Sequence, residues 1–242
     1  MSMDNEEMML NKYIAHCGIC SRRAAVELIK NKQIQVNNKI IEEPFYVVKP
    51  TDHVSYKNHK ITITKNKVYI ILNKPKDYIT TTQDTHDRKT VMNLIQQATT
   101  ERIYPVGRLD RNTTGVLLFT NDGDLAKKLT HPSCNITKIY DIVLDKKLHP
   151  EHAQQLLKGF ELEDGLSRFD QLMYLQEQDK TILRVQLHSG KNRIIRRMFE
   201  HLGYDVIKLD RIQFANLNKN KLARGKWRNL TSGELNILKY LQ

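Results

Sequence analysis

The sequence predicts an α+β protein in two parts, with a largely antiparallel sheet in the larger part. Helical and strand-like segments mix along the chain without a regular βα repeat, and several strand-like segments follow one another closely. A short polar stretch, residues 64–68, separates a small N-terminal unit of two helices and strands from the remainder. A chain of 242 residues with 40% hydrophobic content is long enough for two packed cores.

The N-terminal unit is expected over residues 8–63, after a loose polar tail at 1–7. Apolar residues recur at helical spacing from Leu10 to Cys17, which predicts a first helix. Ser21 is a candidate N-cap for a second helix, because its side chain can accept a hydrogen bond from the first turn. Alternating residues then predict strands that turn at two consecutive asparagines.

This unit resembles the RNA-binding domain named after the small-subunit ribosomal protein S4. The similarity lies in residues 21–25 (Ser-Arg-Arg-Ala-Ala), 28–29 (Leu-Ile) and 36–39 (Val-Asn-Asn-Lys). Asn38 stands where a glycine is commoner, and asparagine also tolerates the left-handed turn conformation. Without the resemblance, the basic residues of this unit could equally form a helix face that contacts only solvent. The resemblance implies that the following side chains face RNA phosphates: Arg22, Arg23, Lys30, Lys32 and Lys39.

The larger domain is expected over residues 69–242, and its strands are indicated by apolar or alternating runs. The runs at 68–72 and 116–119 are apolar throughout, as in buried strands. Residues 138–144 alternate, so every second side chain shares a face. Two further strands are expected near 168–175 and 181–188.

The helices of this domain are indicated by apolar spacing and by end signals. Asp124 is expected to cap one helix, and Thr231 opens the last helix with a capping-box pattern that Glu234 completes. The other expected helices span 91–97, 125–130, 150–159 and 192–202.

Residues 107–115, Gly-Arg-Leu-Asp-Arg-Asn-Thr-Thr-Gly, form the most informative segment. Asp110 lies between Arg108 and Arg111 on a loop bounded by glycines. Neighbouring guanidinium groups favour the ionised carboxylate, which suits a nucleophile or a base. The local chemistry equally allows a surface turn with ordinary ion pairs, because structural carboxylates also gather arginines.

Residues 107–126 resemble the catalytic motif of ribosomal RNA pseudouridine synthases of the RsuA type, RluB-like members in particular. The similarity is ungapped and continues through 131–132 and 138–140. The resemblance implies that Asp110 is the catalytic carboxylate and that Tyr140 stacks on the target base. It also implies a mixed sheet with the active cleft across its middle.

Residues 188–198 resemble the last motif of that family, with Ser189 and Ile194 where glutamate and glutamine are common. Arg196 aligns with the arginine that pairs with the catalytic aspartate. A solvated basic helix face is the alternative interpretation. Lys74-Pro75 resembles the first motif, although a glycine usual shortly afterwards is missing. The basic residues of this domain expected to contact RNA are Lys74, Arg108, Arg111, Lys138, Lys191, Arg193 and Arg197.

The composition favours nucleic acid as the partner, and the resemblance implies that this nucleic acid is ribosomal RNA. The protein is expected to be a monomer in the cytoplasm. The net charge is +12 and the pI is near 9.5, which favour an anionic partner. No apolar run approaches the roughly 20 residues that span a bilayer, and the first seven residues are polar rather than signal-like. Cys17 and Cys20 form a C-x-x-C pair, but a zinc site would need a second pair at usual spacing. The implied reaction isomerises uridine to pseudouridine and needs neither cofactor nor metal.

Two other functions remain open from the sequence. A catalytically silent RNA-binding or ribosome-assembly protein would need only the basic faces. A metal-dependent phosphotransferase or nuclease could use Asp110, Asp122 and Asp124, although Asp122-Gly-Asp124 fits a turn and helix cap better. The sequence does not identify the uridine, but the resemblance favours large-subunit ribosomal RNA.

Overall fold

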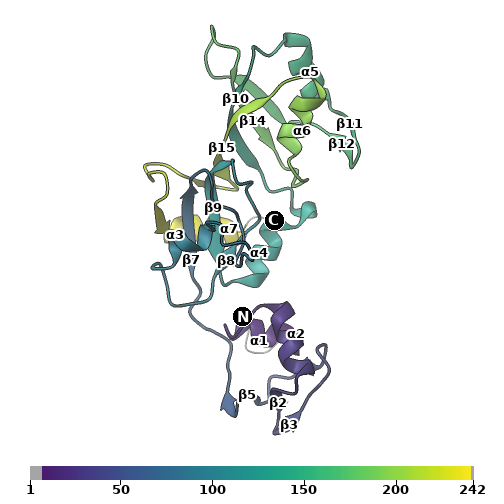
Figure 1. The fold of residues 1–242 in the computed structure, drawn as a ribbon, viewed down its shortest axis with the longest axis vertical. Coiled ribbons are helices and arrows are strands. Elements are labelled where there is room, and N and C mark those ends of the chain that lie inside the picture. The colour runs from purple at the N-terminus through teal and green to yellow at the C-terminus, as the bar shows by residue number, and fades with distance from the viewer. Residues whose placement is uncertain (1–6, 241–242) are drawn as a thin grey trace. The chain divides into compact units, whose positions relative to one another are not determined.

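The computed structural model describes residues 7–240, so residues 1–6 of the expected tail lie outside the described residues (Figure 1). The chain divides into two compact units. One contains the chain up to Lys67 together with Thr100–Ile103, and the other contains Val68–Thr99 and the chain from Tyr104 onward. The sequence did not predict that the short segment after residue 99 would belong to the first unit.

The described residues of the first unit form two helices and six short strands. The side chain of Ser21 caps the second helix by accepting a hydrogen bond from the Ala24 amide at 3.1 Å, as the sequence predicts. Asn37 and Asn38 both have positive φ angles, of 51° and 63°, which explains asparagine at this turn. The elements are β1 (Met8–Met9), α1 (Leu10–His16), α2 (Arg22–Lys30), β2 (Ile34–Val36), β3 (Lys39–Ile40), β4 (Val47–Val48), β5 (Val54–Tyr56) and β6 (His59–Lys60).

Apolar residues from both helices and the strands form the core of this unit. Leu10, Ile14, Ala25 and Ile29 are fully buried and form one core cluster that includes the strand residue Ile34. The two cysteines of the C-x-x-C pair pack against the same cluster as partly buried residues, which matches a packing role. Burial raises the pKa of the first of them, at position 17, to about 12.

The second unit is built on a nine-stranded mixed sheet with the central order β13-β14-β10-β15-β9-β7-β17. All neighbouring strands are antiparallel except β9 and β15, which are parallel. The predicted mixed, largely antiparallel sheet is therefore confirmed. The strands are β7 (Tyr69–Lys74), β8 (Tyr104–Pro105), β9 (Thr114–Thr120), β10 (Lys138–Leu144), β13 (Gln171–Tyr174), β14 (Ile182–Leu187), β15 (Val206–Phe214), β16 (Leu217–Asn218) and β17 (Trp227–Asn229).

Helices cover this sheet, and a separate hairpin is formed by β11 (Phe160–Leu162) and β12 (Gly165–Ser167). Buried residues of α4 and α7 join the core formed by β7 and β9. In Figure 1, α5 and α6 lie over the half of the sheet that contains β10 and β14. The helices are α3 (Val91–Ile95), α4 (Gly123–Thr130), α5 (Pro150–Lys158), α6 (Ile194–His201) and α7 (Ser232–Tyr240).

Two of the differences from the sequence-based prediction matter for the site described below. The cap of α4 is Asp122, whose carboxylate accepts a hydrogen bond from the Leu125 amide at 3.2 Å, whereas Asp124 lies in the first turn. The helix therefore begins two residues earlier than expected. The long strand β15 was not predicted, because its charged residues at positions 208, 210 and 211 interrupt the apolar pattern.

The parallel pair at the centre of the sheet requires a glycine. Gly115 on β9 lies opposite Arg211 on β15, and its φ is +108°. A Cβ atom at position 115 would lie 2.1 Å from the carbonyl oxygen of Arg211, so no other residue fits without moving a strand. The second glycine of the 107–115 motif thus joins the two halves of the sheet beside the loop that carries Asp110.

Candidate active site

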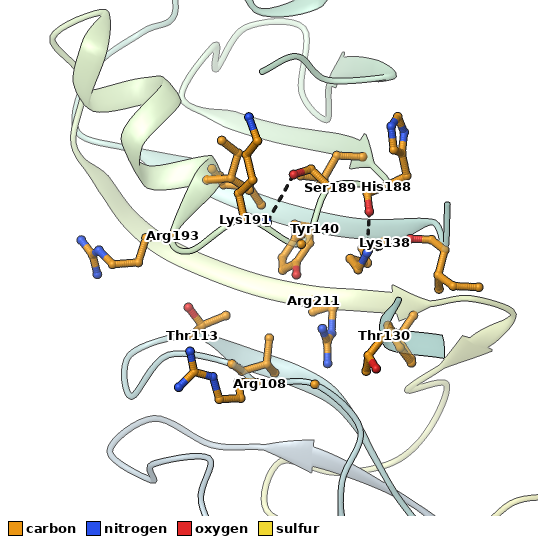
Figure 2. Close-up of a pocket in the computed structure, with 18 of the residues that line it drawn as sticks. Arg108, Thr113, Thr130, Lys138, Tyr140, His188, Ser189, Lys191, Arg193 and Arg211 are labelled. Carbon is orange, nitrogen blue, oxygen red and sulfur yellow. Dashed lines mark hydrogen bonds between the residues drawn. The ribbon is translucent and has the colours of Figure 1, made fainter. Parts of the chain in front are cut away.

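A pocket of about 720 Å³ opens beside the central parallel pair (Figure 2). The loop before β9, the first residues of β10, the start of α6 and strand β15 all line it. The pocket therefore lies across the middle of the sheet, where the family resemblance places the cleft. The lining residues of most interest are Arg108, Asp110, Lys138, Tyr140, Arg193, Arg196 and Arg211.

Backbone contacts hold the loop that presents Asp110. The Thr80 hydroxyl donates to the Leu109 carbonyl at 2.7 Å, and the Thr113 amide donates to the Asp110 carbonyl at 3.1 Å. The Asp110 side chain remains 35% exposed and lines the pocket. The loop is fixed through its backbone, which leaves the carboxylate available to a substrate.

Lys74 has a different role from the one the sequence indicated. Its side chain is fully buried, so it does not contact RNA phosphates as expected. Its ammonium donates hydrogen bonds to the carbonyls of Pro75, Asp110, Arg111 and Thr113 at 2.9–3.2 Å. Burial outweighs the attraction of the Asp110 carboxylate and lowers the pKa of Lys74 to about 8. Lys74 therefore organises the backbone of the Asp110 loop.

The arginine that contacts Asp110 is Arg193 rather than Arg196. Arg193 Nη1 lies 3.8 Å from Asp110 Oδ2, and the same guanidinium lies 3.6 Å from Glu200. Arg196 donates instead to the Val206 carbonyl at 2.6 Å, at the start of β15. Burial lowers the pKa of Arg196, with Arg193 contributing and the Asp110 carboxylate opposing. The expected pairing of Arg196 with Asp110 is thus made by Arg193, because Val206 holds the Arg196 guanidinium.

Tyr140 and Lys138 occupy alternate positions on β10 and both line the pocket. The Tyr140 side chain is 8% exposed, and Figure 2 shows its ring directed into the pocket. The Lys138 ammonium donates to the carbonyls of Ile136 and His188 at 2.9 Å and 2.7 Å. Burial, with a smaller contribution from Arg211, lowers the pKa of Lys138 to about 8.

The other predicted RNA-binding residues fall into two groups. Lys191 donates to the carbonyls of Gly165 and Leu166, and Arg197 makes two hydrogen bonds with Asp164 at 3.0 Å and 2.7 Å. These two cations fasten α6 and the loop before it to the β11–β12 hairpin, so their main contacts are within the protein. The exposed group comprises Arg22, Arg23, Lys30, Lys32, Lys39, Arg108, Arg111 and Arg193, of which Lys32 pairs with Glu42 and Arg111 with Asp77.

The two positions where the last motif departs from the common pattern have ordinary structural roles. Ile194 is 6% exposed and begins α6, with its side chain among the pocket-lining residues. The Ser189 hydroxyl accepts a weak hydrogen bond from the Lys191 amide at 3.3 Å, drawn in Figure 2. Both residues shape the wall that precedes the helix.

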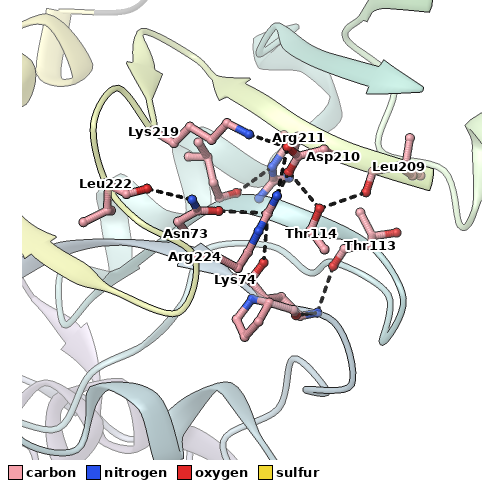
Figure 3. A network of polar contacts seen from close by, with 12 residues as sticks. Asn73, Lys74, Thr113, Thr114, Leu209, Asp210, Arg211, Lys219, Leu222 and Arg224 are labelled. Atoms are coloured by element: carbon pink, nitrogen blue, oxygen red, sulfur yellow. Dashed lines mark hydrogen bonds and ion pairs between the residues drawn. The ribbon is translucent and has the colours of Figure 1, made fainter. Parts of the chain in front are cut away.

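Sequence reasoning missed a polar network centred on Asp210 (Figure 3). The Asp210 carboxylate accepts hydrogen bonds from Thr114 at 2.8 Å and Arg224 at 2.9 Å, and from Lys219. Burial opposes ionisation, but these hydrogen bonds outweigh it and lower the pKa of Asp210 to about 2. Arg224 also donates to the Asn73 side chain at 2.9 Å, which connects β15 to β7. The sequence feature that could have indicated this network is the group of charged residues at positions 208, 210 and 211 of β15, which interrupt an otherwise apolar pattern.

The described residues contain no group of three or more His, Cys, Asp or Glu side chains arranged to hold a metal ion. Asp122, considered above as a metal ligand, accepts a hydrogen bond from the Tyr69 hydroxyl at 2.8 Å in addition to capping α4. Its role is structural. Among the helices that the structure describes, none has the length and apolar character needed to cross a membrane.

Two family models match the chain. Residues 68–201 match RNA pseudouridylate synthase, and residues 8–54 match the S4 domain. The chain belongs to the RNA pseudouridylate synthase family. The pocket described above is therefore the candidate active site of an RNA pseudouridine synthase, an isomerase, and the smaller unit is its S4 domain.

Relatives resemble the synthase over nearly its whole length. "Ribosomal large subunit pseudouridine synthase B" of Bacillus subtilis is 40% identical over 236 residues, covering 96% of each chain. An "Uncharacterized RNA pseudouridine synthase" of Aquifex aeolicus is 36% identical, covering 95% of this chain and 92% of its own. A crystal structure of a pseudouridylate synthase shares the fold, with a TM-score of 0.69, 24% identity and coverage of 96% of this chain and 99% of that chain.

Proposed function

We propose that the protein converts a uridine of large-subunit ribosomal RNA to pseudouridine, with Asp110 as the catalytic carboxylate. The observation that supports this most directly is the placement of Asp110 and Tyr140 in one pocket of a pseudouridine synthase. The relatives named for the large ribosomal subunit support the choice of RNA. A net charge of +12 fits such a polyanionic partner.

The reaction is an isomerisation and balances without a co-reactant. The bond from the sugar C1′ to base N1 breaks, a bond from C1′ to base C5 forms, and one proton moves from C5 to N1. Asp110 either attacks C1′ or removes the 2′ proton of the sugar, and both routes need an ionised carboxylate beside the ribose. The guanidinium of Arg193 lies 3.8 Å from the Asp110 carboxylate and can hold it in position.

The base must leave its stack to reach the pocket, at a cost of a few kcal/mol. Tyr140 offers an aromatic face on which an extruded pyrimidine can stack. The exposed arginines at positions 108 and 193 border the same pocket and suit the flanking phosphates. The exposed basic residues of the S4 domain would add sequence-independent affinity.

We further propose that the protein acts as a monomer in the cytoplasm.

The test compares Asp110→Asn with a matched control, Asp77→Asn, on ribosomal RNA from a strain that lacks the protein. Asp77 is 64% exposed and pairs with Arg111, so its substitution removes the same charge close to the loop. We expect Asp110→Asn to lose pseudouridine formation while it retains RNA binding, and Asp77→Asn to remain active. Near-normal turnover by Asp110→Asn would refute the role of Asp110. If ribosomal RNA from the deletion strain kept every pseudouridine, the silent RNA-binding function would be favoured instead.

A further inference from the structure

The pocket contains a buried arginine with a hydrogen-bonding group that the protein leaves unused. Arg211 is 3% exposed and lines the pocket from β15. Its Nε donates to the Val116 carbonyl at 2.8 Å, and its guanidinium carbon lies 4.8 Å from the centre of the Phe214 ring. Its Nη2 atom is buried and has no hydrogen-bond partner among the described residues.

Leaving a buried guanidinium nitrogen without a partner costs free energy, so such a group indicates a missing acceptor. Figure 2 shows the Arg211 side chain entering the pocket from β15, below Tyr140. Tyr140 and Arg211 are also paired in register on the neighbouring strands β10 and β15. A flat ring stacked on Tyr140 would therefore bring its edge toward Arg211.

We infer that Arg211 donates a hydrogen bond to the O4 carbonyl of the extruded uracil and thereby selects uridine over cytidine. This inference rests on the proposed function. A guanidinium is only a donor, whereas cytidine presents an amino group, also a donor, at position 4. A site built to bond one polar group strongly rejects an analogue that lacks it, because the buried partner stays unpaired.

A carbonyl fits this site better than a phosphate does. Nε is already engaged by the Val116 carbonyl and the face of the guanidinium by Phe214, so the side-on fork of Nε and Nη is not available to phosphate. Arg211 is also buried, whereas Arg108 and Arg193 are exposed at the same pocket and can meet phosphates without desolvating them.

The geometry of the reaction allows this hydrogen bond to persist. For C5 to replace N1 opposite the sugar, the uracil ring turns about the axis through N3 and C6. That rotation exchanges the positions of the two carbonyls, O2 and O4. A donor fixed beside one carbonyl in the substrate therefore meets the other carbonyl in the product. Arg211 would keep one partner throughout and hold the detached base in the pocket.

The experiment uses the full chain and an RNA fragment that spans the uridine identified in the deletion strain. Three fragments carry uridine, 4-thiouridine or 2-thiouridine at that position, because sulfur accepts hydrogen bonds poorly. Single-turnover rates are measured for the wild type, Arg211→Met and a control, Arg184→Met. Arg184 lies on β14 in the same sheet and pairs with Asp141 at 2.7 Å.

We expect thio-substitution at the contacted carbonyl to slow the wild type and Arg184→Met by about tenfold or more, the scale of a charged hydrogen bond. Arg211→Met should be slower on uridine and insensitive to the same substitution, because a double-mutant cycle isolates the pair. The effect should appear with 4-thiouridine. An effect confined to 2-thiouridine would place the contact at O2, which cytidine also has, and would overturn the selection of uridine.

Equal thio effects in the wild type and Arg211→Met would overturn the inference while leaving the proposed function intact. Failure of the wild type to convert the unmodified fragment would overturn both. If Arg211→Met does not fold, as judged by its melting curve, Arg211→Lys serves in the same cycle. Wild-type rates that were equal on all three fragments would refute the contact without any variant.

Discussion

The buried ammonium of Lys74 donates a hydrogen bond of 3.0 Å to the backbone carbonyl of Asp110. The first motif of the catalytic domain therefore holds the second motif through the backbone rather than through the carboxylate. Three further carbonyls around the loop share the same ammonium. Because this ammonium is fully buried and donates to four carbonyls, its contacts add to the other hydrogen bonds that fix the shape of the loop.

Lys74→Met should damage both stability and catalysis. Four carbonyls would lose their buried donor, which we expect to lower the free energy of unfolding by about 2–4 kcal/mol. The single-turnover rate at saturating RNA should fall at least about tenfold, with RNA affinity little changed, because the Asp110 carboxylate loses its placement. The matched control is Lys76→Met, at an exposed position two residues away. A variant with a normal rate but weaker, less salt-dependent RNA binding would restore the phosphate role for Lys74.

The pH profile should separate activity from stability. The pKa of Lys74 is about 8, so its ammonium loses a proton as pH rises through 8 and keeps only two donors for four carbonyls. We expect the single-turnover rate to decline above pH 8. The unfolded lysine keeps its proton to about 10.5, so the unfolded state binds more protons between pH 8 and 10.5, and this group makes stability rise with pH there.

The pKa of Lys138 is also about 8, so the rate profile of the wild type alone does not separate the two lysines. A Lys74→Arg variant that remains active should lose the Lys74 part of the decline, because a guanidinium does not titrate there. A decline unchanged in Lys74→Arg would assign the whole effect to Lys138.

The two arginines beside Asp110 should have different effects. Arg193 makes the contact with the carboxylate, so Arg193→Lys should lower the single-turnover rate at saturating RNA by about three- to tenfold. Arg196 is held by the Val206 carbonyl, so Arg196→Lys should chiefly lower the melting temperature, by a few degrees. Rates on saturating RNA and melting curves of both variants test this. A slower rate for Arg196→Lys together with a lower melting temperature for Arg193→Lys would support the pairing of Arg196 with Asp110 that the family resemblance implies.

Asp210→Asn should destabilise the catalytic domain in a pH-dependent way. The pKa of Asp210 is lowered from 3.8 to about 2, so its contribution is complete above about pH 4 and is lost as pH falls to 2. The shift corresponds to about 2 kcal/mol. Trp227 is the only tryptophan and lies on β17 of the catalytic domain, so its fluorescence follows unfolding of that domain.

We expect the stability difference between the wild type and Asp210→Asn to be largest at pH 5–7 and to shrink towards pH 2. Asp77→Asn, at an exposed ion pair, should show almost no difference at any pH. A constant difference from pH 7 to pH 2 would show that the network around Asp210 acts through shape rather than through charge.

The S4 domain should contribute phosphate contacts through the start of α2. Arg22 and Arg23 are exposed there, so their joint replacement by glutamine should weaken RNA binding and reduce the slope of log affinity against log salt by about 1–2. The control replaces Lys146 and Lys147, two exposed lysines after β10, by glutamine. Equal slopes for the two double variants would mean that the arginines contribute only through net charge.

Patterns in the sequence were enough to predict the fold class, the loop carrying Asp110 and the strand carrying Tyr140. These depend on local patterns, such as apolar runs, caps and turn residues, which act over a few positions. The N-cap at Ser21 and the strand Lys138–Leu144 were both predicted on that basis. The family resemblance added the functional roles that are expected of the residues in these motifs.

The roles of the individual lysines and arginines depend on contacts between distant segments, which form only in the folded protein. Lys74 and Arg211 look like other basic residues in the sequence, yet both are buried, because β7 and β15 pair with β9 from opposite sides. Arg193 replaces Arg196 at Asp110 because the carbonyl of Val206, ten residues along the chain, holds the Arg196 guanidinium. Residues 95 or more positions apart meet in this sheet, so no periodicity within one segment could have predicted their contacts.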